Sequence, residues 1–196
     1  VFEISTGTEY QVTSFSNDVL FPSWSPNGKQ LAFFVNVSGT WDLYVSDLQG
    51  KSYRQVSVGG NAGNATWSPE GDRIAYQVPG QNIVVVDTVG ALLGTVPNSA
   101  GAIWFDWHAN DESLCILTGF NLSFWGPPVS VPATNLTYLF PAGTSDREMF
   151  CDATTADGGL AVAYRYYSFS QGYQNRITVL APDGTPWHVP LGSYSA

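Results

Sequence analysis

The sequence predicts an all-β protein built from repeated four-stranded units, because two landmarks recur along the chain with nearly the same period. The first is a Trp-Ser-Pro-x-Gly type of turn followed by an apolar strand, and its copies cover 21–33, 64–76, 107–117 and 157–163. The second is an Asp/Asn strand that closes on a glycine, and its copies cover 42–50, 82–90, 135–143 and 175–184. Units of about 40–45 residues with four strands each are typical of a β-propeller.

Each unit contains four strand signals in a fixed order. The first strand ends at the tryptophan, and the second is the Leu-Ala-Phe type of run after the glycine. The third is the Asp-Leu-Tyr-Val type of run, and the fourth follows its closing glycine, as at 53–56. In the turn at 25–28 the proline presets one backbone angle and the glycine takes the position that needs an open one. No stretch sustains a helical period of apolar residues, so we expect strands throughout.

The repeat predicts a single propeller domain over 1–196 with about four and a half blades. The predicted units are a half blade at 1–13 and full blades at 14–57, 58–98, 99–148 and 149–196. The half blade lacks its first two strands, and an unpaired sheet edge is something proteins avoid. We therefore expect the chain to be part of a longer propeller, or to be completed by a partner that donates strands. If the chain is complete as given, head-to-tail assembly is a third option.

Packing of neighbouring blades is expected to bury the repeated tryptophans Trp24, Trp67 and Trp107 between sheets. Burial of one large side chain contributes roughly 1.5–3 kcal/mol. These residues are therefore interpreted as core between blades and not as platforms for a ligand.

Composition excludes some classes of partner. The formal net charge is −9 and only 12% of residues are charged, so a phosphate backbone would be repelled and nucleic acid is not expected. No apolar run approaches the length of a membrane span. The sequons at Asn36, Asn121 and Asn135 are candidate glycosylation sites and hint at an exported protein. A fourth, at Asn64, is expected to be too buried for modification.

The repeat resembles the WD-like propeller repeat of the TolB type, which also occurs in propeller domains of prolyl-oligopeptidase-like proteins. The resemblance rests on the Trp-Ser-Pro-x-Gly-x-x-Ile/Leu-Ala-Phe/Tyr run and on the strand closed by glycine. It covers essentially the whole chain, strongly in the first two full blades and weakly in the last two. It implies a propeller, often in the envelope, the periplasm or outside the cell, that serves protein–protein contact. It implies no chemistry, because fold and function separate readily in this architecture.

Residues for catalysis or metal binding are sparse. There is no Gly-x-Ser-x-Gly motif, and the two histidines, His108 and His188, have no metal-ligand spacing. A pair of carboxylates from different blades that acts as in a glycosidase stays open as an alternative, but no spacing in the sequence supports such a pair. We expect no enzyme activity and no cofactor. Cys115 occupies a small buried position, and Cys151 lies on a strand of the next blade, so they are either separate thiols or a disulfide between blades.

The departures from the repeat predict where a partner binds. The loops between the second and third strands of the last two blades are rich in aromatic residues, and in a propeller such loops emerge on one face. The candidate contact residues are Phe120, Phe124, Trp125, Tyr166, Tyr167, Phe169 and Tyr173. Large aromatic residues dominate contact energy at interfaces, although these loops could instead cover the rim of the propeller itself.

Two functions follow. The first is a non-catalytic scaffold or protein-interaction module of an envelope or extracellular protein, which binds a protein partner or assembles with itself through the open half blade. The alternative is the propeller domain of a larger enzyme, with a peptidase-gating or carbohydrate-active role, which keeps carbohydrate as a second ligand class.

Overall fold

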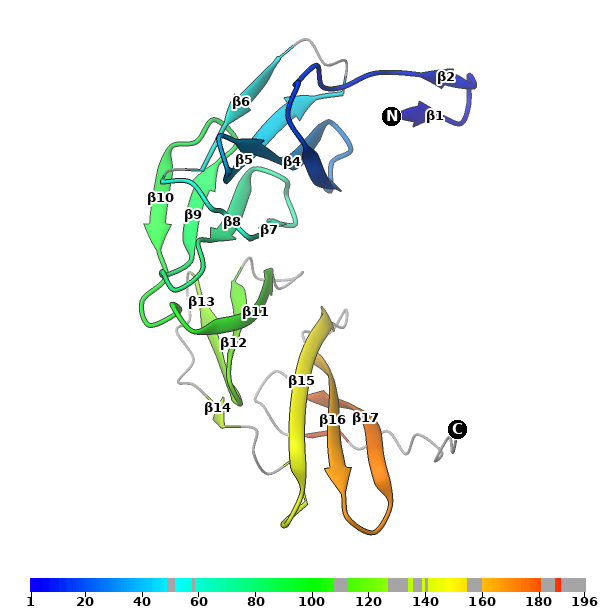
Figure 1. Cartoon of the computed structure of the whole chain (residues 1–196), viewed down its shortest axis with the longest axis vertical. Helices are drawn as coiled ribbons and strands as arrows, with labels where there is room; N and C mark the ends of the chain where they lie inside the picture. The colour runs from blue at the N-terminus through cyan, green and yellow to red at the C-terminus, as the bar shows by residue number, and fades with distance from the viewer. Residues whose placement is uncertain are drawn as a thin grey trace. The chain divides into compact units, whose positions relative to one another are not determined.

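The computed structural model shows a chain of antiparallel sheets (Figure 1). It describes residues 1–48, 52–57, 59–107, 113–126, 134–135, 139, 141–154, 160–180 and 186–187. The chain divides into two compact units, Val1–Gly101 and Ala102–Ala196. Within the described residues, no helix is long and apolar enough to cross a bilayer.

The first unit contains a two-stranded hairpin and two four-stranded sheets. The hairpin pairs β1 (Phe2–Glu3) with β2 (Thr8–Glu9). The next sheet is formed by β3 (Val19–Trp24), β4 (Gln30–Val37), β5 (Thr40–Asp47) and β6 (Tyr53–Gln55). The following sheet is formed by β7 (Asn64–Trp67), β8 (Arg73–Gln77), β9 (Val84–Asp87) and β10 (Leu92–Thr95). Each strand pairs antiparallel with its neighbour in sequence, which is the meander of a propeller blade.

The second unit contains two more sheets of the same kind. One is formed by β11 (Ala102–Trp107), β12 (Leu114–Thr118), β13 (Asn121–Trp125) and β14 (Thr134–Asn135). The other is formed by β15 (Ser145–Thr154), β16 (Leu160–Ser168), β17 (Gly172–Leu180) and β18 (Pro186–Trp187). The boundary predicted between 148 and 149 therefore falls inside β15, because the polar run 145–148 carries no apolar strand signal.

The turn between the first and second strands has the same hydrogen bonds in both sheets of the first unit. Ser25 Oγ accepts a hydrogen bond from the backbone N of Gln30 at 2.9 Å, and Ser68 Oγ accepts one from the N of Arg73 at 3.0 Å. Gly28, the glycine of the first turn, has a φ of 69°, in the left-handed region that glycine adopts without strain. The Ser-Pro-x-Gly motif thus acts as a hydrogen-bonded turn, as its sequence predicts.

A serine after the fourth strand ties the outgoing chain back to the start of the third strand. Ser57 Oγ accepts from the backbone N of Leu43 at 2.9 Å and donates to Asp42 Oδ1 at 3.2 Å. In the next sheet Ser99 Oγ accepts from the N of Ile83 at 2.7 Å. The recurring Asp/Asn-Leu/Ile pair is therefore held by a downstream serine, a contact that the repeat pattern alone did not reveal.

The two sheets of the first unit share one apolar core. It joins Ala32, Phe34, Leu43, Val45, Val56 and Ala62 to Trp67, Ile74, Tyr76 and Val86. Trp67 is 7% exposed, and its Nε1 donates to the backbone O of Ser23 on β3 of the preceding sheet, at 3.2 Å. The prediction that a repeated tryptophan packs between blades is confirmed at this residue.

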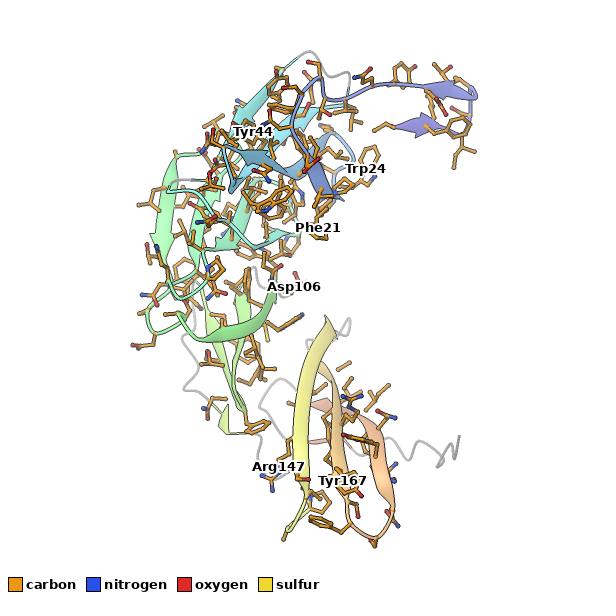
Figure 2. The ribbon with its side chains drawn as sticks, viewed as in Figure 1. Phe21, Trp24, Tyr44, Asp106, Arg147 and Tyr167 are labelled. Carbon is orange, nitrogen blue, oxygen red and sulfur yellow. The ribbon has the colours of Figure 1, made fainter. Side chains whose placement is uncertain are left out.

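The same prediction is wrong for Trp24, whose side chain is 49% exposed (Figure 2). Trp24 pairs with Leu31 as Trp67 pairs with Ile74, so the two tryptophans hold the same place in their sheets. No four-stranded sheet precedes β3 in the first unit, and the hairpin of β1 and β2 has every strand residue exposed. Trp24 therefore lacks the cover that the first sheet gives to Trp67.

The core of the second unit lies between β11–β14 and β15–β18. It contains Cys115, Leu117, Leu122, Val162, Tyr166 and Leu180. Because side chains alternate along a strand, Val162 and Tyr166 of β16 face this core while Arg165 and Tyr167 face the other side of the sheet.

Candidate functional site

The structure divides the predicted aromatic contact residues into a core group and a surface group. Tyr166 is 7% exposed, and Phe120 and Phe124 are half-buried against the same core of the second unit. Trp125 is also half-buried and lies at the end of β13, opposite Leu114. Tyr167, Phe169 and Tyr173 instead gather at the turn between β16 and β17. The seven predicted contact residues therefore do not form one patch, and Tyr167, Phe169 and Tyr173 remain as the candidate contact surface.

The surface group forms a compact aromatic cluster, named here the hairpin cluster: Tyr167, Phe169 and Tyr173 with Arg165. The ring of Tyr167 makes edge contacts with Phe169 at 5.6 Å and with Tyr173 at 5.3 Å between centroids. Phe169 is 82% exposed and Tyr173 is 56% exposed. Contacts between the rings hold these side chains in place while they remain open to solvent, and Figure 2 marks Tyr167 near the tip of the hairpin.

A positive charge accompanies the hairpin cluster. The Arg165 guanidinium carbon lies 5.1 Å from the centroid of the Tyr173 ring, which is the geometry of a cation–π contact. Tyr173 and Asn175 on β17 face the same side as Tyr167 and Arg165 on β16, because these residues pair directly across the two strands. The surface therefore combines flat apolar rings with a cation, a composition that suits an aromatic or acidic side chain of a protein partner.

The hairpin cluster lies beyond the length of an ordinary blade in this chain. The hairpin of β4 and β5 closes where Val37 pairs with Thr40. Counted from the apolar anchors Leu31 and Leu160, the equivalent pair in the last sheet is Tyr166 with Gln174, and the hairpin continues through 167–173. The rings thus stand on an extension that packing of the blade does not require.

A groove in the first unit is the second surface feature. It has a volume of about 460 Å³ and lies between β3 and β7, the first strands of the two sheets. Its lining includes the apolar side chains of Phe34 and Trp67 together with Asn64 and Thr66. At its mouth Phe21 is 71% exposed and has a φ of 52°, a left-handed conformation that costs a bulky residue about 1–3 kcal/mol.

Another aromatic cluster of the first unit is structural. Phe15, Phe33, Tyr44 and Tyr53 contact one another on the face of the first sheet that points away from Trp67. Phe33 is 1% exposed, and burial raises the pKa of the Tyr44 hydroxyl, with a further contribution from Asp42. The segment that carries Phe15 thus covers part of that face.

The asparagines of the predicted glycosylation sequons differ in exposure. Asn36 is half-buried at the end of β4, where its Oδ1 accepts from the N of Gly39 at 2.9 Å. Asn121 is exposed on β13 and pairs in register with Asn135 on β14, whose side chain lies outside the described set. The expectation that Asn64 is buried is wrong, because β7 is an edge strand and its first residue is exposed beside the groove.

The roles of the cysteines and histidines stay predictions. Cys115 is fully buried in the core of the second unit, and Cys151 lies on β15 opposite Val162, with its side chain outside the described set. His108 and His188 fall on residues that the structure does not describe. Among the side chains that it does describe, no three or more His, Cys, Asp or Glu residues come together as metal ligands.

Comparison with known proteins gives the fold. No protein-family model matches the chain, and no curated protein matches it. Solved structures do match, at low sequence identity. TolB from Acinetobacter baumannii is 14% identical with a TM-score of 0.56, and the match covers 89% of this chain and 54% of TolB.

Two further structures match over most of the chain. A eukaryotic initiation factor is 15% identical with a TM-score of 0.55, over 91% of this chain and 45% of that one. The acylaminoacyl peptidase of Pyrococcus horikoshii is 15% identical with a TM-score of 0.61, over 96% of this chain and 34% of that one. The chain thus spans about half of the length of these proteins or less. These likenesses and the succession of four-stranded meanders show that the chain has an all-β propeller fold.

Proposed function

We propose that this chain is a non-catalytic, protein-binding propeller module of an envelope or extracellular protein, and that the hairpin cluster contacts the partner. The observation that carries the proposal is the exposure of Phe169 and Tyr173 on a hairpin longer than blade packing requires. Exposed aromatic groups of this size supply most of the binding energy at protein interfaces. The Arg165 guanidinium adds a preference for acidic residues near an aromatic anchor.

Selection of peptides from a random-sequence library against the intact chain tests this proposal. We expect the selected peptides to be rich in aromatic and acidic residues. The double variant Phe169→Ser, Tyr173→Ser should weaken their binding by roughly 30-fold, the effect of losing about 2 kcal/mol at an interface hot spot. The matched control is Leu92→Ser, which removes another exposed apolar side chain, 66% exposed, from β10. Peptides that bind the double variant as tightly as the unchanged chain would overturn the proposal.

Location outside the cytoplasm is the second part of the proposal, and its support is the exposed sequon at Asn121. Expression through the secretory pathway of a glycosylating host should give a glycan mass that Asn121→Gln removes. Asn36 should carry less glycan, because it is half-buried whereas Asn121 is exposed. Secreted chain with neither site occupied would remove this support.

The alternative function is the propeller part of a larger enzyme, with a peptidase-gating or carbohydrate-active role. Its support is the likeness to a peptidase of which this chain spans a third of the length, together with the apolar groove beside Phe21. Binding of the intact chain to a glycan array, retained in the Phe169→Ser, Tyr173→Ser variant and lost in Phe21→Gly, would favour this alternative.

A further inference from the structure

The groove between β3 and β7 is formed by two neighbouring sheets of the first unit. Phe34 on β4 belongs to the first of these sheets and Trp67 on β7 to the second, and both line the groove. The same two residues belong to the apolar core that joins the sheets. The volume of about 460 Å³ lies within the range of roughly 300–1,000 Å³ that is usual for small-molecule sites. The groove is therefore large enough for a ligand, and two sheets that pack against each other supply its walls.

The strand β3 departs from the repeat where it lines the groove. In the next sheet the pairing of β7 with β8 runs without interruption along the whole strand. In β3 the register with β4 shifts between Leu20 and Ser23, so Phe21 and Pro22 lie in a bulged part of the strand. A bulge re-aims the side chains beside it, and bulges are frequent next to functional sites. This local departure indicates a role that the packing of the repeat does not need.

The bulge holds Phe21 in a conformation that costs free energy. Its φ of 52° lies in the left-handed region, and 71% of the side chain is exposed. The ring of Phe21, which Figure 2 labels, meets the ring of Phe34 edge-on, with 6.4 Å between the centroids and 80° between the planes. Strained residues of this kind cluster at ligand-binding sites. The ring at the mouth of the groove therefore fits a residue that covers a bound molecule.

The lining of the groove indicates the chemistry of that molecule. Every described residue that lines it is uncharged, although the chain has a formal net charge of −9. The polar side chains are those of Ser23, Asn64 and Thr66, and the other side chains are apolar. Asn64 is exposed, and its carboxamide makes no hydrogen bond within the described part of the chain. This carboxamide can donate a hydrogen bond to a ligand or accept one from it.

From these observations we propose that the groove binds a small, uncharged aromatic molecule that carries one hydrogen-bonding group. The aromatic ring contacts Phe21 and Phe34, because edge-to-face contacts add to the free energy gained from buried apolar area. The hydrogen-bonding group meets the Asn64 carboxamide. An ionised ligand is disfavoured because no described lining residue would compensate its charge, and a sugar is disfavoured because most of its hydroxyls would face apolar side chains. The site goes beyond the protein-binding function proposed above and uses no residue of the hairpin cluster.

A ligand-observed NMR titration of the intact chain with three related compounds tests the chemical class. We expect naphthol, which is neutral and has one hydroxyl group, to bind with a sub-millimolar dissociation constant. Naphthalene, which lacks the hydroxyl, should bind about 5-fold more weakly, the effect of losing one hydrogen bond. Naphthoate carries a negative charge and should bind at least about 10-fold more weakly than naphthol, because the lining offers it no cation.

Two variants of the groove test which residues make the contact. Phe21→Gly should weaken naphthol binding roughly 10-fold, since it removes an aromatic contact and the apolar area around it. It also relieves the left-handed φ, so the chain should stay folded, which circular dichroism checks. Asn64→Ala should weaken the binding of naphthol about 5-fold and leave that of naphthalene unchanged. Leu92→Ser removes an apolar side chain that is 66% exposed on β10, and as the matched control it should bind naphthol as the unchanged chain does.

Several results would overturn the proposal. They are the absence of naphthol binding at millimolar concentration, equal binding of naphthol by Phe21→Gly and the unchanged chain, and naphthoate bound as tightly as naphthol. A glycan that binds in place of naphthol, and that Phe21→Gly no longer binds, would instead assign the groove to carbohydrate. The double variant Phe169→Ser, Tyr173→Ser should keep full naphthol binding, so the protein-binding proposal can fail while this one stands. Loss of naphthol binding in that double variant alone would place the compound on the hairpin cluster and refute a site in the groove.

Discussion

Substitution of Trp67, compared with Trp24, measures how much a neighbouring sheet contributes to the stability of a blade. An aromatic side chain buries about 150–250 Å² when fully covered, which corresponds to roughly 4–6 kcal/mol at about 25 cal/mol per Å². Trp67 is 7% exposed and receives nearly all of this, whereas Trp24 is 49% exposed and receives about half. Because the two tryptophans hold equivalent positions in their sheets, the difference in the stability they contribute measures the effect of the covering sheet and not that of the strand.

We expect Trp67→Ala to lower the free energy of unfolding by about 3–5 kcal/mol, the usual cost of removing a large buried aromatic side chain. Trp24→Ala should cost about 2 kcal/mol, because half of its surface is already in water. Trp67→Phe keeps most of the packing but leaves Ser23 O without its donor, which should cost about 1–2 kcal/mol. Trp24→Phe should cost less than Trp67→Phe, since no described residue accepts from its indole.

Urea unfolding followed by far-ultraviolet circular dichroism measures these differences. The slope of each transition shows whether a variant unfolds the same amount of surface as the unchanged chain. If Trp67→Ala leaves too little folded protein, the two phenylalanine variants still give the comparison. Equal losses for Trp24→Ala and Trp67→Ala would refute the argument that a sheet of the repeat covers one tryptophan and not the other.

Three further predictions concern single hydrogen bonds and one strained residue. Ser57→Ala should cost about 1–3 kcal/mol in a urea titration, because the buried N of Leu43 loses its acceptor; a change within error would show that this bond is dispensable. Burial would raise the pKa of the Asp72 carboxyl, but hydrogen bonds from Ser68 and Arg73 outweigh it and lower this pKa below 3.8. Asp72 therefore stabilises the fold at pH values above 3.8, this stability is lost as the pH falls through the lowered pKa, and Asp72→Asn should flatten the acid limb of a stability–pH profile. Phe21→Gly relieves a φ of 52° on an exposed ring, so it should leave stability unchanged or raise it by about 1 kcal/mol, and a clear loss would contradict this assignment of strain.

The strands and turns could be predicted because their signals are local. The Ser-Pro-x-Gly turn carries its own hydrogen bonds, and Trp67 lies between sheets as its repeat position indicates. The exposure of Trp24 could not be predicted, because a repeat tells which face a residue points to and not whether another sheet lies against it. The exposure of Asn64 has a similar origin, since only the sheet order shows that β7 is an edge strand.

The candidate contact residues could be predicted only as a group. Tyr166 and Tyr167 are neighbours in sequence, yet one is buried in the core and the other stands in the hairpin cluster. Side chains alternate along a strand, so a shift of one residue in the register exchanges the two faces. The sequence shows no strict alternation across 164–173, so it locates the aromatic segment without assigning its members to either face.

The length of the β16–β17 hairpin has a consequence for how this protein can change. The rings of residues 167–173 lie past the last pair shared with the shorter hairpin of β4 and β5, so substitutions there remove little from the core. Selection can therefore alter the tip, or exchange it for another loop, while the sheets beneath keep their sequence. A variant in which the turn at 38–39 replaces 167–173 should fold and should lack the aromatic rings of the hairpin cluster. A different recognition loop could then be inserted at the same place.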